Sequence, residues 1–347
     1  MIKPCKMKKT RLSSNGFFLL IVFLFSTASC DWEVSEGGIS HSKGASSEIL
    51  VVTDNKEHWK SSIGDTIMSF FYQYIEALPQ PEPMFNLVNI PQQAFSKMYK
   101  SHRSIFIVDI DSSFKKPLIE SKKDLWAKPQ QVIKITAPDK QSFFEEFNKY
   151  KESFLKKYIA VEHERILNAF RSTENSKVIN KLQKKFGFYM TIPGGFKVAK
   201  SAKNFMWIKK ETLTYSQGLL IHSEPYTDTG QFNPDYIIKR RNLITKAFVP
   251  GPTDSSWMST DMKYVLPVHE EMNFKKMYAV ETRGLWIVEN DFMGGPFVSY
   301  TFAKGDRIYT VEAYVYAPAE EKRDYMRQME AVLHSLRFVE DQGKGGE

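Results

Sequence analysis

The chain has 347 residues, of which 48 are Lys or Arg and 40 are Asp or Glu, giving a net charge of +8. Five basic and no acidic residues lie in residues 1–30, so the remainder carries 43 basic against 40 acidic residues, a net charge of +3. Nucleic-acid binding calls for basic charge clustered on one face, and this nearly balanced remainder gives no argument for it. We expect no nucleic-acid partner.

The N-terminus predicts an export signal that ends at a cysteine. A basic start, the apolar run 17–25 and small residues before Cys30 form the three parts of a secretion signal. The run is too short for a membrane-spanning helix, which needs about 20 residues. Residues 1–29 are therefore predicted to be a signal peptide, and Cys30 to carry a lipid such as palmitate. Plain secretion stays open, because Thr27 and Ser29 also suit ordinary signal peptidase.

The segment after the signal predicts a tether. Residues 30–47, which begin with the lipidated Cys30, are rich in Gly, Ser and charge, a composition typical of flexible linkers. Residues 341–347 are expected to be a disordered tail. The lipid would hold the protein to a membrane of the cell envelope, facing the periplasm or the surface, and not in the cytoplasm.

Residues 48–180 alternate strand and helix patterns and predict an α/β layered domain. Apolar runs predict strands at 48–53, 85–90, 104–109 and 131–136. Helical spacing predicts helices at 58–74 and 95–99 and a long helix through residues 143–170. Thr136, with an acid three residues on, is the predicted start of that long helix.

Residues 181–340 instead predict an α+β domain, with strands in series and flanking helices. Strands are expected at 186–192, 205–210, 219–223, 278–288, 297–302 and 307–316, and helices at 235–248 and 318–336. A Pro, Gly and Ser loop at 249–257 follows the first of these helices.

No motif in the chain predicts a catalytic residue, a cofactor or a metal site. His163-Glu164 begins like a zinc helix, but Leu167 stands where the second histidine ligand is required. An alternative function, a hydrolase or transferase acting on envelope material, would need an acid/base pool. Its candidates are Asp109, Asp111, His269, Glu289 and Asp291. Asp109 and Asp111 follow a predicted strand, where α/β folds often place ligands.

Two aromatic segments are candidates for binding a partner. Aromatic residues with arginine are typical of binding patches, and the stretch 283–297 combines them with Gly-Gly. The candidates are Trp257, Arg283, Trp286, Phe292, Met293, Gly294, Gly295 and Phe297. The structural alternative is a hairpin with a Gly-Gly turn and aromatic residues in the core. Arg240 and Arg241 suit either an anionic partner or a solvated helix face.

Three of these motifs also carry a family resemblance. The segments Leu78-Pro-Gln-Pro-Glu-Pro83, Phe248-Val-Pro-Gly-Pro252 and Phe292-Met-Gly-Gly-Pro-Phe297 resemble a Bacteroidetes-type lipoprotein family classed as a domain of unknown function, family 4837, over residues 46–340. The resemblance implies an envelope location and a lipid anchor, and no activity. Residues 183–338 are similar in pattern to the PsbP/Mog-one-like α/β/α sandwich, whose members mostly act as accessory or binding modules.

These observations favour a membrane-anchored envelope lipoprotein that acts as a binding or accessory module and not as an enzyme. Its expected partners are the membrane, through the N-terminal lipid, and an envelope protein or polymer.

Overall fold

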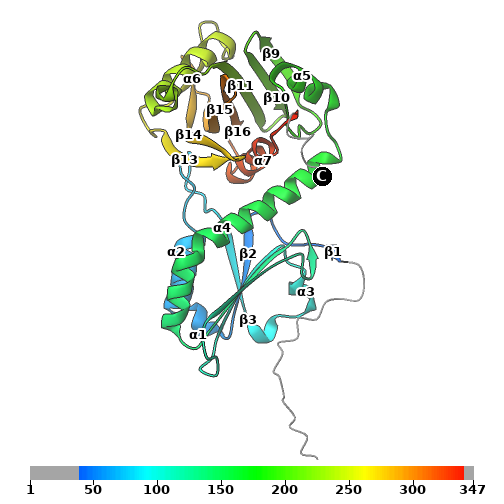
Figure 1. The fold of residues 1–347 in the computed structure, drawn as a ribbon, viewed down its shortest axis with the longest axis vertical. Coiled ribbons are helices and arrows are strands. Elements are labelled where there is room, and N and C mark those ends of the chain that lie inside the picture. Colours follow the sequence, from blue (N-terminus) through cyan, green and yellow to red (C-terminus); the bar gives the residue numbers. More distant parts are fainter. Residues whose placement is uncertain (1–38, 340–347) are drawn as a thin grey trace, which may run out of the picture. The chain divides into compact units, whose positions relative to one another are not determined.

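The computed structural model describes residues 39–339, which form an α+β chain with a mixed sheet in the first half and a curled antiparallel sheet in the second (Figure 1). The predicted signal, Cys30, the first part of the tether and the predicted tail lie outside these residues. Among residues 39–339, no helix is both long and apolar enough to cross a membrane.

The first half is built on a five-stranded sheet in the order β3-β2-β4-β7-β5. Its strands are β2 (Glu48–Thr53), β3 (Asn86–Pro91), β4 (Ser104–Ile110), β5 (Leu118–Lys123) and β7 (Gln131–Ala137). The first four strands in that order are parallel, and β5 runs antiparallel to β7. The central strands β2, β4 and β7 are buried along most of their length, as expected of parallel strands covered on both faces.

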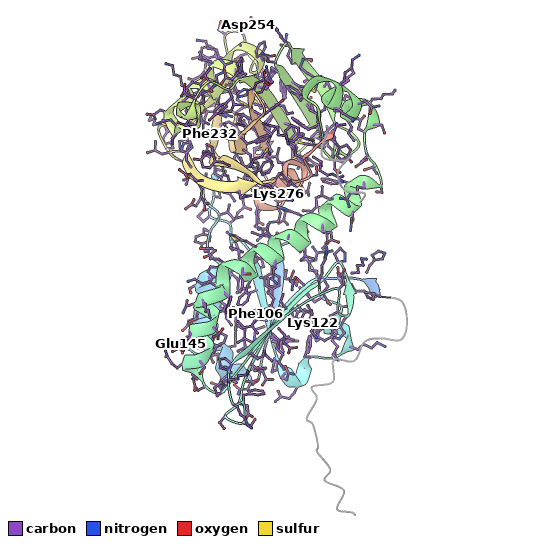
Figure 2. All side chains as sticks on the ribbon, in the orientation of Figure 1. Phe106, Lys122, Glu145, Phe232, Asp254 and Lys276 are labelled. Atoms are coloured by element: carbon purple, nitrogen blue, oxygen red, sulfur yellow. The ribbon has the colours of Figure 1, made fainter. Side chains whose placement is uncertain are left out.

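Helices cover one face of this sheet with a phenylalanine-rich core. The helices of this half are α1 (Lys56–Trp59), α2 (Ser62–Phe71), η1 (Gln92–Ala94), α3 (Lys97–Lys100) and α4 (Lys140–Arg171). Phe106 of β4, labelled in Figure 2, makes an edge contact with Phe71 of α2 and with Phe147 of α4, at 5.7 and 5.9 Å. The cap of α4 is Asp139, which accepts a hydrogen bond from the Ser142 amide; Thr136, the predicted start, belongs to β7.

The second half is built on a long antiparallel sheet in the order β12-β14-β15-β16-β11-β10-β9, with β13 also paired to β14. Its strands are β9 (Lys197–Ala202), β10 (Phe205–Glu211), β11 (Ser216–Pro225), β12 (Trp257–Thr260), β13 (Val268–Phe274), β14 (Met277–Glu289), β15 (Gly294–Lys304) and β16 (Arg307–Tyr316). Two short pairs complete the strands: β1 (Ser40–His41) with β6 (Ala127–Lys128), and β8 (Phe188–Tyr189) with β17 (Arg337–Phe338).

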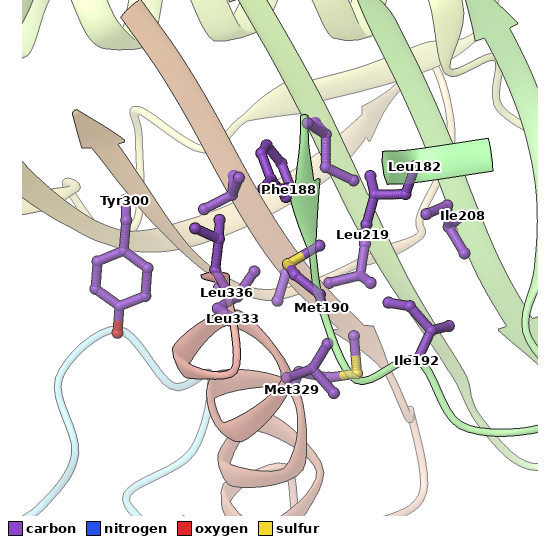
Figure 3. Packing of buried hydrophobic residues seen from close by; sticks show 14 of the residues in the cluster. Leu182, Phe188, Met190, Ile192, Ile208, Leu219, Tyr300, Met329, Leu333 and Leu336 are labelled. Carbon is purple, nitrogen blue, oxygen red and sulfur yellow. The ribbon is translucent and has the colours of Figure 1, made fainter. Parts of the chain in front are cut away.

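Helices lie on both faces of this second sheet. They are α5 (Ser176–Phe186), η2 (Thr229–Phe232), α6 (Pro234–Phe248) and α7 (Arg323–His334). Figure 3 shows the core on one face, where Leu182 of α5 and Leu333 of α7 pack with Ile208 and Leu219 of the sheet. On the other face α6 contributes Ile238 to a separate core. Helix α5 spans the predicted domain boundary at residue 180 and packs entirely into the second core.

Hydrogen bonds join the proline-rich segment 78–83 of the first half to the N-terminus of α7 in the second. Both carboxylate oxygens of Glu82 accept backbone N–H groups, from Lys322 at 2.7 Å and from Arg323 at 2.8 Å. Glu82 is only 4% exposed. Arg327 then donates to the Ser47 hydroxyl and the Met84 carbonyl. The carboxylate thus caps a helix that belongs to the other half of the chain, and it lies at the positive end of that helix dipole.

Glu82→Ala is expected to lower the free energy of unfolding by about 2 kcal/mol, because it leaves two buried N–H groups without an acceptor. Urea unfolding of the two variants Glu82→Ala and Glu82→Gln checks this, with Gln retaining one acceptor oxygen and losing less. Glu321→Ala removes an exposed acid just before the same helix and should change little. Equal losses from Glu321→Ala and Glu82→Ala would contradict the capping role.

Candidate functional site

Two aromatic residues of the predicted binding patch are core residues. Trp286 is 2% exposed and its indole N–H donates to the Val315 carbonyl at 3.2 Å. Phe297 is 1% exposed and lies 4.0 Å beneath the Arg241 guanidinium. On β14 and β15 alternate side chains face the core, and these two positions fall on the covered side. The expectation that they touch a partner is therefore wrong, and the hairpin alternative describes this part of the chain.

The glycines of that hairpin do not form its turn. Gly294 and Gly295 begin β15, while the turn lies at residues 290–293, with Asn290 at a φ of 64°. A Cβ at Gly295 would lie 2.1 Å from the Val315 carbonyl oxygen and 3.2 Å from the Trp286 indole nitrogen. The backbone approach that Gly-Gly allows is therefore toward the protein's own core.

Arg283, the cationic candidate, is held in ion pairs. Its guanidinium lies 2.6 Å from the carboxylate of Glu281 and 2.6 Å from that of Glu330 on α7. Burial alone would lower the pKa of Arg283, but these carboxylates outweigh it and hold that pKa well above its ordinary value. Because these two carboxylates already match its charge, Arg283 does not attract an anion from outside the protein.

The ion pairs of Arg283 form part of the wall of a cavity of about 380 Å³. The wall draws on residues of both halves of the chain. Apolar and charged side chains both line it, among them Leu78, Met84, Ile159, Val268, Glu76, Glu270, Glu281, Arg283, Phe297, Arg323, Met326, Arg327 and Glu330. In this wall the charge of Arg283 is matched by two carboxylates, while Arg327 donates hydrogen bonds to Ser47 and Met84.

Buried histidines lie beside this ion-pair cluster. His163 of α4 contacts His334 of α7, with ring centroids 5.1 Å apart, and the His334 ring lies 3.1 Å from the Tyr300 hydroxyl. Burial and the neighbouring His334 lower the pKa of His163 to about 3. Burial and Arg240 do the same for His222 on β11, whose pKa also falls to about 3. Both imidazoles are therefore neutral in the folded protein at neutral pH.

The folded protein is expected to lose stability as the pH falls below about 6.5. An unfolded histidine takes up a proton near pH 6.5, whereas His163 and His222 do so only near pH 3 when folded. Between these values the unfolded chain binds more protons, so each residue removes about 1.4 kcal/mol of stability per pH unit. Urea unfolding at pH 7 and pH 5 measures this difference.

Matched histidine variants test the assignment. The double variant His163→Phe, His222→Phe should show a flatter dependence of unfolding free energy on pH than the unmodified protein. His41→Asn, at an exposed position, should leave the dependence unchanged. An unaltered slope in the double variant would show that other groups govern the acid response.

The remaining members of the predicted patch are accessible. The Phe292 side chain is fully exposed, in the turn between β14 and β15, and Met293 is half-buried. The Asp291 carboxylate accepts the Phe292 backbone N–H at 2.6 Å and fixes that turn. Trp257 is half-buried at the start of β12. These three side chains are the part of the patch that a partner can reach.

The loop that carries Trp257 is ordered by its own hydrogen bonds. The Gly251 amide donates to the Ser256 carbonyl at 2.9 Å, and the Ser256 hydroxyl donates to the Thr253 carbonyl at 2.6 Å. A Cβ at Gly251 would lie 2.3 Å from the Ser256 Oγ, so the loop closes only with glycine there. Asp254 marks the exposed tip of the loop in Figure 2. The loop therefore presents Trp257 from a fixed backbone.

Trp257 lines a second cavity, of about 350 Å³, which we call the tryptophan cavity. Its walls come from β9, β10, the end of α6 and the loop 249–257: Ala199, Lys200, Trp207, Lys246, Ala247, Phe248, Pro250, Ser256 and Trp257. Phe248 stacks on Phe205 at 4.8 Å, which fixes one wall to the core. Lys246 lies 4.3 Å above the Trp257 ring, a cation–π contact.

Sequence reasoning missed most of this cavity. Trp207 was expected only as part of a strand, and Lys200 and Lys246 were not singled out. The Trp207 indole donates to the Tyr314 hydroxyl at 2.8 Å, which fixes the orientation of this half-buried side chain. The sequence does offer a signal, because both the loop 249–257 and the strand β10 contain tryptophan. Whether the loop and the strand come into contact depends on where α6 packs.

The carboxylates proposed for acid/base chemistry are not brought together. Asp109 pairs with Lys134 at 2.9 Å in the first sheet, and Asp111 accepts a backbone N–H from Ser113. Asp291 caps its own turn, and His269 contacts the Thr282 hydroxyl at 2.9 Å. Neither these four residues nor Glu289 lines either cavity. Over residues 39–339, no group of three or more His, Cys, Asp or Glu side chains could hold a metal ion.

At the carboxyl ends of β2 and β4 the structure adds a residue that the sequence did not single out. Asp54 accepts the Ile110 backbone N–H at 2.9 Å and lies 3.1 Å from Nδ1 of His58. Burial raises the pKa of Asp54, and the hydrogen bond from Ile110 opposes that rise. The carboxylate ties two neighbouring strands together, so its contacts account for it as a structural residue.

Two family models match consecutive parts of the chain. Residues 42–171 match the domain of unknown function DUF8532, and residues 174–335 match the domain of unknown function DUF4837. The predicted match to family 4837 is confirmed for residues 174–335, but its expected extent over residues 46–340 is wrong, because residues 42–171, with the motif at 78–83, match the other family. Both families are defined without a function, so neither assigns an activity. No curated protein matches the chain.

Solved structures resemble the chain only remotely. A crystal structure from Bacteroides thetaiotaomicron VPI-5482 aligns at 10% identity and a TM-score of 0.27, over 46% of this chain and 47% of that one. The chain thus spans about half the length of that protein. The human StarD13 (DLC2) lipid transfer and protein localization domain aligns at 9% identity and a TM-score of 0.20, over 46% of this chain and 92% of that one. Scores this low carry no argument about function.

Proposed function

We propose that this protein is a non-enzymatic binding module of the cell envelope, anchored by lipid on Cys30, and that it binds its partner at the tryptophan cavity. The observation that carries the proposal is the contrast between the aromatic residues. Trp286 and Phe297 are used in the core, whereas Trp257 and Trp207 stay partly exposed around a concave surface. Partly exposed indoles in a recess are typical of binding sites.

The anchor rests on the N-terminal sequence. A basic segment, a short apolar run and small residues precede Cys30, and a soluble tether would follow it. The same proposal includes two further points. The chain would belong to a Bacteroidetes-type lipoprotein family, and its second half would be a PsbP/Mog-one-like sandwich. What supports the sandwich is that α5 and α7 cover one face of the second sheet and α6 the other.

The binding role can be tested by photo-crosslinking in intact cells. A photoreactive amino acid replaces Ala247, which is exposed and lines the tryptophan cavity. Illumination should give a crosslinked species that is absent when the same amino acid replaces Leu213, a fully exposed residue in the turn between β10 and β11. A third label at Phe292 reports on the remaining exposed part of the predicted patch. Crosslinks from 292 alone would move the binding site there, and none at any position would contradict the role.

The anchor can be tested by metabolic labelling with an alkyne analogue of palmitate. The full chain should incorporate the label and sediment with membranes, while Cys30→Ser should lose the label and leave the membrane fraction. Unlabelled protein recovered from the medium would instead indicate plain secretion and overturn the anchor. In that case the crosslinking experiment would still decide whether the tryptophan cavity is a binding site.

A further inference from the structure

We propose that the ligand of the tryptophan cavity is an acidic polysaccharide whose sugar rings carry carboxylates, such as a polyuronate. This inference rests on the proposed binding role and names the chemical class of its ligand. It follows from the charge of the cavity wall, from the placement of lysines beside indoles, and from the open position of the cavity at the edge of the sheet.

The wall of the tryptophan cavity is cationic. Lys200 and Lys246 both line it and are exposed, and no acidic residue lines it. Neither ammonium makes an ion pair with a carboxylate of residues 39–339, whereas the nearby Lys209 pairs with Glu211 at 2.7 Å. The cavity beside Arg283 is different, because four glutamates line it and two of them pair with Arg283. Charge complementarity therefore favours an anionic ligand here.

Each indole of the cavity has a lysine beside it. Lys246 lies over the Trp257 ring at 4.3 Å. Lys200 is the direct cross-strand partner of Trp207 in the β9–β10 pair, which places their side chains next to one another; Lys209, which is paired with Glu211, lies over the Trp207 ring at 4.8 Å. A pyranose ring with a carboxylate offers both matching features in one unit, an apolar C–H face for the indole and a negative charge for the ammonium. Two such indole–lysine pairs suit a ligand that repeats this unit.

The position of the cavity suits a chain better than an enclosed small molecule. Strand β9 is the last strand of the sheet and pairs only with β10, so the cavity opens at an edge. The rim residues Ala199, Ala247 and Pro250 are exposed and lack long side chains. A polymer can therefore lie across both indoles and continue beyond them. Lysines on an edge strand also deter pairing with other sheets, a role that the control variants below separate from ligand binding.

Binding of the purified, full-length lipoprotein to immobilised polymers tests the inference. The probes are polygalacturonate, neutral dextran and polyglutamate, an acidic polymer without sugar rings. The protein should bind polygalacturonate, and Lys200→Glu with Lys246→Glu should weaken this binding at least tenfold. Binding should also weaken as salt rises, because the charges are exposed. Dextran and polyglutamate should bind at least tenfold more weakly than polygalacturonate.

Matched variants exclude a general effect of charge or folding. Lys177→Glu with Lys181→Glu makes the same change of net charge on exposed positions of α5 and should bind as the unmodified protein does. Lys197→Glu changes an exposed lysine of β9 that does not line the cavity and should also bind normally. Trp257→Ala should lose binding and Trp257→Phe should retain part of it, with the melting temperature reporting on folding.

Three outcomes would overturn the inference. They are no binding to polygalacturonate, equal binding by the cavity and control charge variants, and polyglutamate binding as tight as polygalacturonate, which would assign an acidic peptide instead. If the protein crosslinks from position 247 in cells but does not bind polygalacturonate, the binding role stands and only the ligand class is wrong. Loss of both would remove the proposed function as well.

Discussion

Trp286→Ala is expected to lower the free energy of unfolding by about 3–5 kcal/mol, the usual range for removing a buried tryptophan side chain. The indole packs against Tyr314 with ring centroids 5.6 Å apart and donates its N–H to Val315. Its removal leaves a cavity between α6 and the sheet, and it leaves the Val315 carbonyl without the indole donor. Gly295, which lies beside the indole, has no side chain that could fill the cavity. Urea unfolding measures this loss of unfolding free energy. It is monitored by circular dichroism of the backbone, a signal that does not depend on tryptophan fluorescence.

Trp257→Ala is the matched control for that experiment. Trp257 is the same residue type on the same sheet, but it is half-buried beside the tryptophan cavity. It should cost much less stability and should abolish crosslinking from position 247. If Trp286→Ala were harmless to stability and removed partner binding, the original prediction of a contact residue would be right and the present assignment to the core wrong.

Glu312→Gln is the second change with a large expected effect, again about 3–5 kcal/mol, because it leaves a buried arginine without its counter-charge. Both partners are almost completely buried, and the two carboxylate oxygens of Glu312 accept from Nε and a terminal nitrogen of Arg241 at 2.8 and 2.7 Å. Arg241 also donates to the Thr260 hydroxyl at 2.9 Å. The pair ties α6, and with it one wall of the tryptophan cavity, to the centre of the sheet.

An exposed ion pair on the same sheet provides the comparison. Glu211→Gln breaks the pair between Lys209 and Glu211, which is open to solvent, and should cost less than about 1 kcal/mol. Replacing both buried partners, as Arg241→Met with Glu312→Leu, should recover part of the loss, since no unpaired charge remains. Similar costs for the exposed and buried single changes would contradict the burial on which the argument rests.

The sequence predicts the parts of the fold where burial and pattern agree. Strands β2, β4 and β7 each contain an apolar run that is buried, and α6 was expected within one residue of its bounds, because its apolar residues recur at helical spacing. Strands β9 and β13 were missed. Both lie at an edge of the sheet and are mostly exposed and polar, so they lack the alternation on which a strand prediction depends.

The candidate site was harder to predict for a related reason. The segment 283–297 has the composition of a binding patch, but composition does not say which face of a strand is covered. Helix α6 covers the face that carries Trp286 and Phe297, and that covering depends on the buried Arg241–Glu312 pair. The same packing brings the 249–257 loop beside β10 and creates the tryptophan cavity. Of the predicted residues, Trp257 is the one that lines it.

The central claim, that the tryptophan cavity is occupied in the envelope, is tested most directly by hydroxyl-radical footprinting of the unmodified protein. Oxidation of Trp257 and Trp207 is compared between intact cells and the purified lipoprotein, with the fully exposed Leu213 as the internal reference. The account predicts that both tryptophans are protected in cells while Leu213 is oxidised equally in the two samples. Equal oxidation of Trp257 in cells and in the purified protein would contradict it.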